Sequence, residues 1–474
     1  MTLPQPVDSA LTATALACCA VLGFSSPNPW EVLWSSALLL LLLRWFWWQN
    51  QPGIMLYCIL IPFVEIHTTL IEANQNDLTL NGLFFGTGRS TFWMSSVSLL
   101  AVAIGVRTLW ASSSRRLFFT LDDLTQAADQ LNQKRLVLAF FSAKLIGEAM
   151  DFAIPYASGF RQLETYALGI SDAILMVIAI KFMLDRKHTL LVILIFTCLI
   201  ALSFFSFFSD WKGPLSILLV ASLTGIRTFN VRQALRLSPI LLPAFLLLFV
   251  WQSIKGEYRA YLNGGKYSQH IVVTQTDALL KFQELASDAI ATDIFNERQI
   301  NATYRRVGYL EYFSSAVSKV PAEIPHQSGQ LLQSNLTFSL LPRILAPDKG
   351  IKNDQAKVER YTDFAFSPYG GSSFSLGHYC EAYIDWGRYG MLIHLFLFGM
   401  LGGGLYLITL SRAVAFNPLL ALGLLWVCMK PWGTFQSDMV TVSGQVFWGA
   451  ICHLIIFFPF YRRANDWIQH QSGH

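Results

Sequence analysis

The stretch 190-LLVILIFTCLIALSFFSFF-208 decides the class of fold, because it carries no charged residue over its whole length. A helix needs about 20 apolar residues to cross about 30 Å of hydrocarbon. The run 36-SALLLLLL-43 is of the same kind, and short charged clusters separate such runs along the chain. The sequence therefore predicts an integral membrane protein.

The composition supports this class. Of the 474 residues, 53% are hydrophobic and only 14% are charged, whereas soluble domains carry about 25% charged residues. The net charge of +4 is too small to indicate a nucleic-acid partner. The seven cysteines include no CxxC pair, so neither a zinc site nor a disulfide scaffold is indicated. We expect no metal and no cofactor.

Hydropathy predicts an all-α polytopic membrane protein with about twelve transmembrane helices. The predicted spans are residues 8–24, 31–48, 53–71, 91–110, 136–157, 165–184, 189–208, 214–231, 238–254, 387–410, 414–430 and 439–460. They divide the chain into a membrane bundle (1–254), a polar segment (255–386) and a second bundle (387–474). Helical spacing predicts short helices at 277–300 and 304–320 of the polar segment, before loops rich in Pro and Gly.

The basic residues predict the topology. If 255–386 lies outside the cytoplasm, about 15 Lys and Arg residues flank the inner ends of the spans and about 4 the outer ends. Basic residues are enriched on the cytoplasmic side of membrane proteins. We therefore expect a large extracytoplasmic loop at 255–386, with both termini in the cytoplasm.

Charged residues inside predicted spans call for an explanation, because placing a charge in hydrocarbon is unfavourable in free energy. Lys144, Glu148 and Asp151 share one face of the fifth span. They form either an internally neutralised cluster or the polar wall of a cavity, as in a transporter. Ionisable residues also occur in the third and sixth spans, namely Glu65, His67, Glu72 and Asp172.

The polar segment is rich in basic residues. They are Arg298, Arg305, Arg306, Arg343, Arg360, Lys349, Lys352 and Lys357. Guanidinium groups bind phosphate oxygens as planar bidentate donors, and lysine adds a point charge. The set suits a lipid-linked pyrophosphate at the membrane surface. Taken singly, each arginine is better explained as the charge of a solvated loop, and the set as a whole favours phosphate binding because it comes with short rigid motifs.

Two short motifs stand out in this segment. In 341-LPRILAPDKG-350, Pro342 and Pro347 restrict the backbone and hold Arg343 and Lys349 in a stiff turn. The second motif, 374-FSLGHYCEAYIDWGRYG-390, leads into the tenth span.

The second motif combines acidic and aromatic side chains. Glu381 and Asp385 lie one helical turn apart. The neighbouring Tyr379, Tyr383 and Trp386 form either an interfacial aromatic belt or stacking platforms for sugar rings.

The order of these elements resembles that of bacterial O-antigen and exopolysaccharide repeat-unit polymerases of the Wzy type. The matching elements are 305-RRVGYLEYFSSAV-317, 342-PRILAPDK-349, 371-GSSFS-375, 381-EAYIDWGRYG-390 and 399-GMLGGG-404. The resemblance covers about 100 residues closely. The chain departs from the family pattern at Gly350, where a second Pro is common, and at Cys380, where Gly is usual.

The resemblance implies a metal-independent membrane glycosyltransferase of the bacterial inner membrane. It would transfer a growing glycan from one undecaprenyl pyrophosphate carrier to the next lipid-linked repeat unit, in O-antigen, capsule or exopolysaccharide synthesis. Its partners would be the lipid-linked oligosaccharide, the bilayer and a chain-length regulator protein, with no nucleic acid.

The resemblance also implies roles for particular residues. Pyrophosphate charge would be stabilised by Arg305, Arg306, Arg343 and Lys349. Either Glu381 or Asp385 would act as the base that activates the acceptor hydroxyl, and Tyr383 and His378 would bind the substrate.

Two alternatives remain open at this point. An O-antigen ligase has the same chemistry and would use His326 or His378; its product would be glycan on a new acceptor. A transporter or flippase would use Lys144, Glu148 and Asp151, and would show ion-gradient-dependent uptake.

Overall fold

The computed structural model describes residues 9–47, 53–113, 119–153, 161–185, 188–204, 211–224, 231–265, 271–292, 295–341, 346, 350, 353–365 and 374–469. Within these ranges every regular element is a helix. The prediction of an all-α fold is therefore confirmed.

The helices follow one another as α1 (Ser9–Phe24), α2 (Pro29–Phe46), α3 (Ile54–Gln75), α4 (Leu80–Leu83), α5 (Gly88–Ser112), α6 (Leu121–Asp129), α7 (Gln133–Ala153), α8 (Arg161–Asp185), α9 (Thr189–Ser203), α10 (Lys212–Thr224), α11 (Val231–Leu262), α12 (Gln275–Ala291), α13 (Glu297–Val307), α14 (Leu310–Lys319), α15 (Gln330–Leu340), α16 (Asp354–Tyr361), α17 (His378–Arg412), α18 (Pro418–Met429), α19 (Met439–Ile451) and α20 (Phe458–Ile468). A short 3₁₀ helix (Ala413–Ala415) follows α17, and a π-helical turn (Cys452–Ile456) follows α19.

Five helices of the described ranges are long and apolar enough to cross a membrane, fewer than the predicted twelve. They are Ile54–Gln75, Gly88–Ser112, Leu163–Asp185, His378–Ala415 and Met439–Ile456. Three further apolar helices, α9, α10 and α18, are shorter. With 15 residues, α9 rises only about 22 Å. The apolar run 190–208 has the length of a membrane span, but the helix that it forms in the described residues, Thr189–Ser203, is shorter than one.

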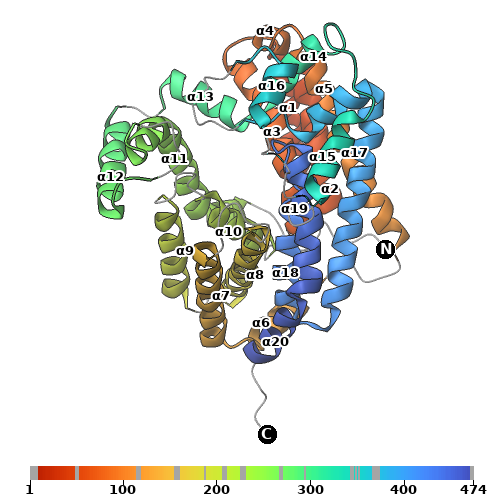
Figure 1. Cartoon of the computed structure of the whole chain (residues 1–474). Helices are drawn as coiled ribbons and strands as arrows, with labels where there is room; N and C mark the ends of the chain where they lie inside the picture. Colours follow the sequence, from red (N-terminus) through yellow and green to blue (C-terminus); the bar gives the residue numbers. More distant parts are fainter. Residues whose placement is uncertain are drawn as a thin grey trace.

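Figure 1 shows two groups of helices on either side of the molecule. One group contains α7–α12; the other contains α2, α3, α5, α17 and α19. The groups meet where α18 packs against α8. Helices α4, α14 and α16 lie together at the end drawn at the top, and α13 lies between them and α11 (Figure 1). Of the polar segment, α13, α14 and α16 therefore lie toward this end, whereas α12 packs against α11, and α15 packs against α17 and α19.

Helices α5 and α17 lie in unusually close contact because glycines face each other across the interface. A Cβ atom on Gly105 would come within 2.2 Å of the Phe396 carbonyl oxygen. A Cβ atom on Gly399 would lie 2.2 Å from the Val102 carbonyl oxygen. Small residues let membrane helices approach each other at backbone distance.

We expect Gly399→Ala to lower the stability of the protein by about 1–3 kcal/mol, because the added methyl group overlaps a backbone oxygen that must move away. Thermal unfolding of the detergent-purified protein measures this effect. Gly404→Ala is the matched control on the same helix, since its Cβ would meet only the Leu109 side chain at 3.5 Å. Equal melting temperatures for both variants would contradict the close contact.

The charged group of the predicted fifth span lies on α7. Lys144 and Glu148 form an i, i+4 ion pair of 2.9 Å, and their side chains are 41% and 54% exposed. The side chain of Asp151 lies outside the described residues. The pair therefore neutralises itself on an outward face of α7, which favours the first of the two interpretations given above.

Candidate functional site

A short segment before α19, residues 435–439, joins several residues that are distant in sequence. The backbone N–H of Phe435 donates to Oε2 of Glu65 at 3.2 Å. The side-chain oxygen of Gln436 accepts from Nη1 of Arg306 at 3.2 Å. The carbonyl oxygen of Ser437 accepts from the backbone N–H of His378 at 2.9 Å. This 435–439 segment therefore connects α3, α13 and α17 just before the start of α19.

The same segment contributes to a buried ionic network. Lys357 on α16 lies 2.5 Å from Oε1 of Glu381 and 3.1 Å from Oδ2 of Asp438. Oε2 of Glu381 accepts from the Asn335 amide at 3.0 Å and from the Met439 N–H at 2.8 Å. Asn335, Lys357, Glu381 and Asp438 form what we call the Lys357 network, which ties α15, α16, α17 and α19 together.

The Lys357 network keeps its lysine charged. Burial lowers the pKa of Lys357, but the carboxylates of Glu381 and Asp438 raise it by more, so that it reaches about 12. The Glu381 and Asp438 side chains are only 2% and 1% exposed. One ammonium group thus lies within ion-pair distance of two buried carboxylates.

The Asp385 carboxylate binds backbone N–H groups in the first turn of α15. Its Oδ1 accepts from the Leu331 N–H at 3.0 Å and its Oδ2 from the Leu332 N–H at 2.7 Å. The first N–H groups of a helix have no partner within the helix, and a carboxylate there also interacts favourably with the helix dipole. Asp385 therefore anchors a helix of the polar segment onto α17.

These contacts bear on the predicted catalytic carboxylates. All four carboxylate oxygens of Glu381 and Asp385 already accept hydrogen bonds from the protein. Both groups therefore hold parts of the protein together in this conformation. Their catalytic role stays a prediction, and the geometry favours a positioning role for both.

Tyr383 and His378, predicted to bind substrate, are buried. The Tyr383 hydroxyl donates to the Val320 carbonyl oxygen at 2.8 Å. The His378 ring stacks on Tyr379 with 4.7 Å between ring centroids, and it is 1% exposed. Both side chains therefore pack inside the protein and do not present a binding surface.

The two adjacent arginines of α13 differ in their partners. Arg305 pairs with Glu72 of α3 at 2.9 Å, although its side chain is 56% exposed. Arg306 has the Gln436 contact and, within the described part of the chain, no ion pair. Arg306 is thus the cation of this pair that is available to a ligand. Arg343 and Lys349 lie outside the described residues.

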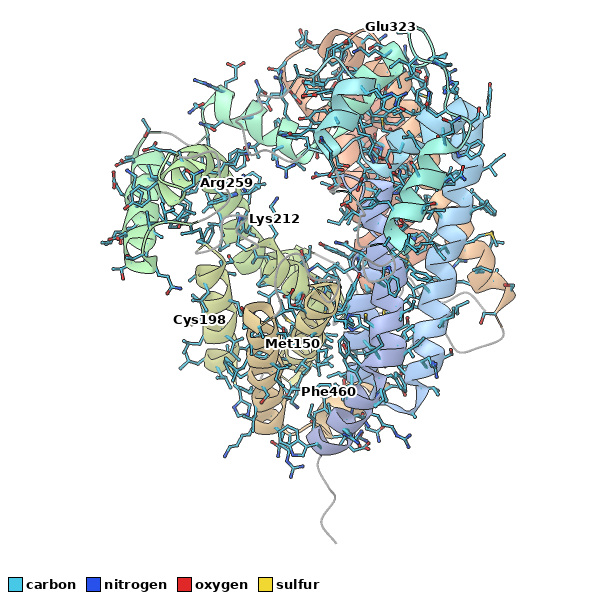
Figure 2. All side chains as sticks on the ribbon, viewed as in Figure 1. Met150, Cys198, Lys212, Arg259, Glu323 and Phe460 are labelled. Carbon is cyan, nitrogen blue, oxygen red and sulfur yellow. The ribbon has the colours of Figure 1, made fainter. Side chains whose placement is uncertain are left out.

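Arg306 belongs to a group of cations that the sequence analysis did not connect. We call Lys212, Lys255, Arg259 and Arg306 the basic cluster. Lys255 interacts electrostatically with the other three. Figure 2 shows Lys212 and Arg259 near each other where α10 and α11 meet. Lys255 lies just beyond the predicted span 238–254. Burial, and after it the three neighbouring positive charges, lower its pKa to about 8.

Glu65 is the acidic neighbour of the basic cluster. It interacts electrostatically with Arg306 and Lys212, and it is partly exposed. Beyond the Phe435 contact, its backbone oxygen accepts from the Tyr309 N–H at 3.0 Å. Glu65 appears in the sequence as an ionisable residue near the end of a predicted span, but only the fold shows that it faces arginine and lysine.

The remaining residues of the site had weak sequence signals. Asp438 precedes an apolar run and caps α19 by accepting from the Thr441 N–H at 3.1 Å, a recognisable helix start. Lys212 and Lys255 flank predicted spans, where basic residues are common. Nothing local in the sequence links any of them to Arg306 or Glu381.

These observations define a class: an all-helical protein with several membrane-length helices and a polar site at one end. The chain belongs to the family described as a domain of unknown function (DUF8712), whose model matches residues 115–408. The matched region contains Lys255, Arg306, Lys357 and Glu381 but neither Glu65 nor Asp438. No curated protein and no solved structure matches the chain.

Proposed function

We propose that the protein is a membrane-embedded glycosyltransferase that polymerises lipid-linked oligosaccharide repeat units for O-antigen, capsule or exopolysaccharide synthesis. One observation supports this most directly. Arg306, which has no ion pair among the described residues, and the partly exposed Glu65 are held by adjacent residues of the 435–439 segment, at the end of a membrane-length helix. A cation and a carboxylate side by side are the two groups that this reaction requires.

The proposed reaction uses the two groups in separate roles. The bond between the anomeric carbon and a pyrophosphate oxygen breaks, and the pyrophosphate leaves with the electron pair. The acceptor hydroxyl oxygen forms the new bond to that carbon and gives its proton to the Glu65 carboxylate. Arg306 stabilises the charge that develops on the departing pyrophosphate. Glu381 and Asp385 position α15, α16 and α17 around this site.

The proposal includes the membrane topology. The protein lies in the bacterial inner membrane with about twelve spans, residues 255–386 outside, and both termini in the cytoplasm. The five membrane-length helices support the membrane placement. The N-terminal end of α19, next to Arg306 and Glu65, then points toward the outer surface, where the head group of undecaprenyl pyrophosphate-linked glycan is found, and Glu65 lies midway along α3 (Ile54–Gln75). A chain-length regulator protein is the expected further partner.

Arg306→Gln tests this proposal. Hydrogen bonds to charged groups contribute about 1.5–3 kcal/mol, so we expect polymerisation to slow by about 10- to 100-fold and lipid-linked single repeats to accumulate. Mass spectrometry of extracted lipid-linked glycans measures both species. Arg298→Gln is the matched control, because Arg298 is exposed at the start of the same helix. Full-length polymer at the normal rate from the Arg306 variant would contradict the proposal.

The alternatives receive less support from the geometry. A ligase would use His326 or His378, but His378 is buried and Nδ1 of His326 lies 3.3 Å from the Ile384 carbonyl oxygen. A transporter would use the α7 charges, of which Lys144 and Glu148 pair with each other on an outward face. Glycan found on a new acceptor, without chain growth, would favour the ligase.

A further inference from the structure

An apolar groove with a volume of about 710 Å³ runs along α17, between α15 and α19. His394 and Met439 line one end of it, and Arg412 lines the other. Helices α17 and α19 are both long and apolar enough to cross a membrane, and they lie side by side in Figure 1. In a membrane, the groove therefore lies at the depth of the hydrocarbon and not in water.

Helix α15 of the polar segment forms a third wall of this groove. Leu332, Leu336 and Leu340 line the groove at intervals of four residues, which places them on one side of the helix. On α15 as well, Ser339 contacts α19, with its Oγ 2.9 Å from Oγ of Ser443. The helix ends at Leu340, and the lining residues beyond it along the groove belong to α17, α19 and the π-helical turn. The groove is thus covered by α15 only near its Met439 end.

The rest of the groove is open at its side. Ile408 of α17 and Ile455 of the π-helical turn line this part, and they are 55% and 59% exposed. Lipid tails are as apolar as such aliphatic side chains. A hydrocarbon chain can therefore enter from the bilayer and pass under α15 without crossing a polar surface.

The dimensions of the groove decide which chain fits. His394 and Arg412 are about 27 Å apart along α17, since an α-helix rises about 1.5 Å per residue. The hydrocarbon core is about 30 Å thick, so a phospholipid tail covers only the about 15 Å of one leaflet. The volume corresponds to a mean cross-section of about 26 Å², about a third of that of a helix about 10 Å wide. One hydrocarbon chain longer than a phospholipid tail therefore matches the groove, whereas a helix of a partner protein is too wide.

Met439 connects the groove to the proposed site. Its backbone N–H donates to Oε2 of Glu381 in the Lys357 network at 2.8 Å. Gln436, which accepts from Arg306, lies three residues earlier, so its Cα atom is at most about 11 Å from that of Met439. A chain that begins at Met439 therefore has its head group within reach of Arg306.

We propose that this groove holds the polyprenyl chain of the carrier lipid, with the pyrophosphate end at Met439 and the chain running toward Arg412. The choice of a polyprenyl carrier rests on the proposed function, and the length and width of the groove support it independently. A polyprenyl chain repeats one isoprene unit many times, so it is longer than a phospholipid tail. Helix α15, anchored by Asp385, covers the units nearest to the pyrophosphate.

The test uses the full-length protein in nanodiscs and a polyprenyl pyrophosphate with a diazirine near the far end of its chain. Irradiation is expected to label α17 and the C-terminal part of α19, which mass spectrometry of the peptides identifies. Leu401→Trp places an indole within the groove and should lower this labelling about tenfold, because the ring overlaps the chain. Ile393→Trp is the matched control, since Ile393 lies on the same helix, is 64% exposed and does not line the groove.

A second variant and a second probe make the test decisive. Ile455→Trp narrows the groove from its other wall and should cause the same loss, so the inference is tested even where one variant fails to fold. Equal labelling of the native protein and a folded groove variant would overturn the inference, as would labelling spread evenly over the membrane-length helices. A phospholipid with a diazirine in its tail should not label the groove in the presence of excess polyprenyl pyrophosphate. Strong labelling by this phospholipid would show that ordinary lipid fills the groove.

The groove and the proposed function can fail separately. If Arg306→Gln slows polymerisation but the polyprenyl probe does not label the groove, the function stands and the groove assignment is wrong. If the probe labels the groove and Arg306→Gln makes normal polymer, the protein binds a polyprenyl lipid but the proposed function is wrong.

Discussion

Replacing Lys357 by methionine is expected to remove a large part of the stability of the folded protein. The substitution leaves the carboxylates of Glu381 and Asp438 buried without their counter-ion. Removing one partner of a buried ion pair costs about 3–5 kcal/mol, whereas small domains are stable by only about 5–15 kcal/mol in total. Four helices meet at this network, so the loss should spread to α15, α16, α17 and α19. Thermal unfolding and size-exclusion chromatography in detergent measure it.

Two controls make this prediction specific. Arg360→Met, which replaces an exposed cation on the same helix, should leave the melting temperature nearly unchanged. Combining Lys357→Met with Glu381→Gln and Asp438→Asn should recover much of the lost stability, because no uncompensated charge remains buried. A single Lys357→Met variant that melts like the native protein would show that the network contributes little.

Glu65→Gln is expected to slow polymerisation by about 10²- to 10⁴-fold, the usual contribution of a general base. The amide keeps the size of the side chain and can still accept the Phe435 N–H, so the fold should be retained. Lipid-linked single repeats should accumulate while binding of the substrate is largely preserved. The rate of chain growth in purified nanodiscs measures the effect.

Glu323→Gln is the control for Glu65, because Glu323 is an exposed carboxylate at the end of the molecule drawn at the top (Figure 2). A second comparison uses Glu381→Gln, provided that the purified variant keeps its native melting temperature. If this variant loses chain growth while Glu65→Gln retains it, the base is Glu381, as the sequence motif predicts, and the assignment to Glu65 is wrong.

The apolar runs were sufficient to predict a helical membrane protein, but the helix boundaries depend on more than hydropathy. Helix α11 continues to Leu262, and α17 begins at His378. An α-helix satisfies its backbone hydrogen bonds internally, so it can continue from apolar into polar sequence. The predicted helix 304–320 is instead interrupted at Gly308, where a Cβ atom would approach Thr69 of α3 to 2.7 Å.

The candidate site could be predicted only in part. The sequence indicated Arg305, Arg306, Glu381 and Asp385 as notable, yet their separate partners depend on long-range contacts. Lys357 lies 24 residues from Glu381 and 81 from Asp438, and Glu65 lies 370 residues from Phe435. Periodicity and composition describe neighbours along the chain, so they carry no information about such pairs.

The 435–439 segment also limits the distance between two of the contacts described above, at Gln436 and at Asp438. Consecutive Cα atoms are 3.8 Å apart, so Gln436, which holds Arg306, and Asp438, which holds Lys357, are at most about 7 Å apart. The positions of Arg306 and of the Lys357 network relative to each other are therefore set by the covalent chain between Gln436 and Asp438. Inserting a single residue between these two positions would shift one against the other, without changing any side chain that either of them contacts.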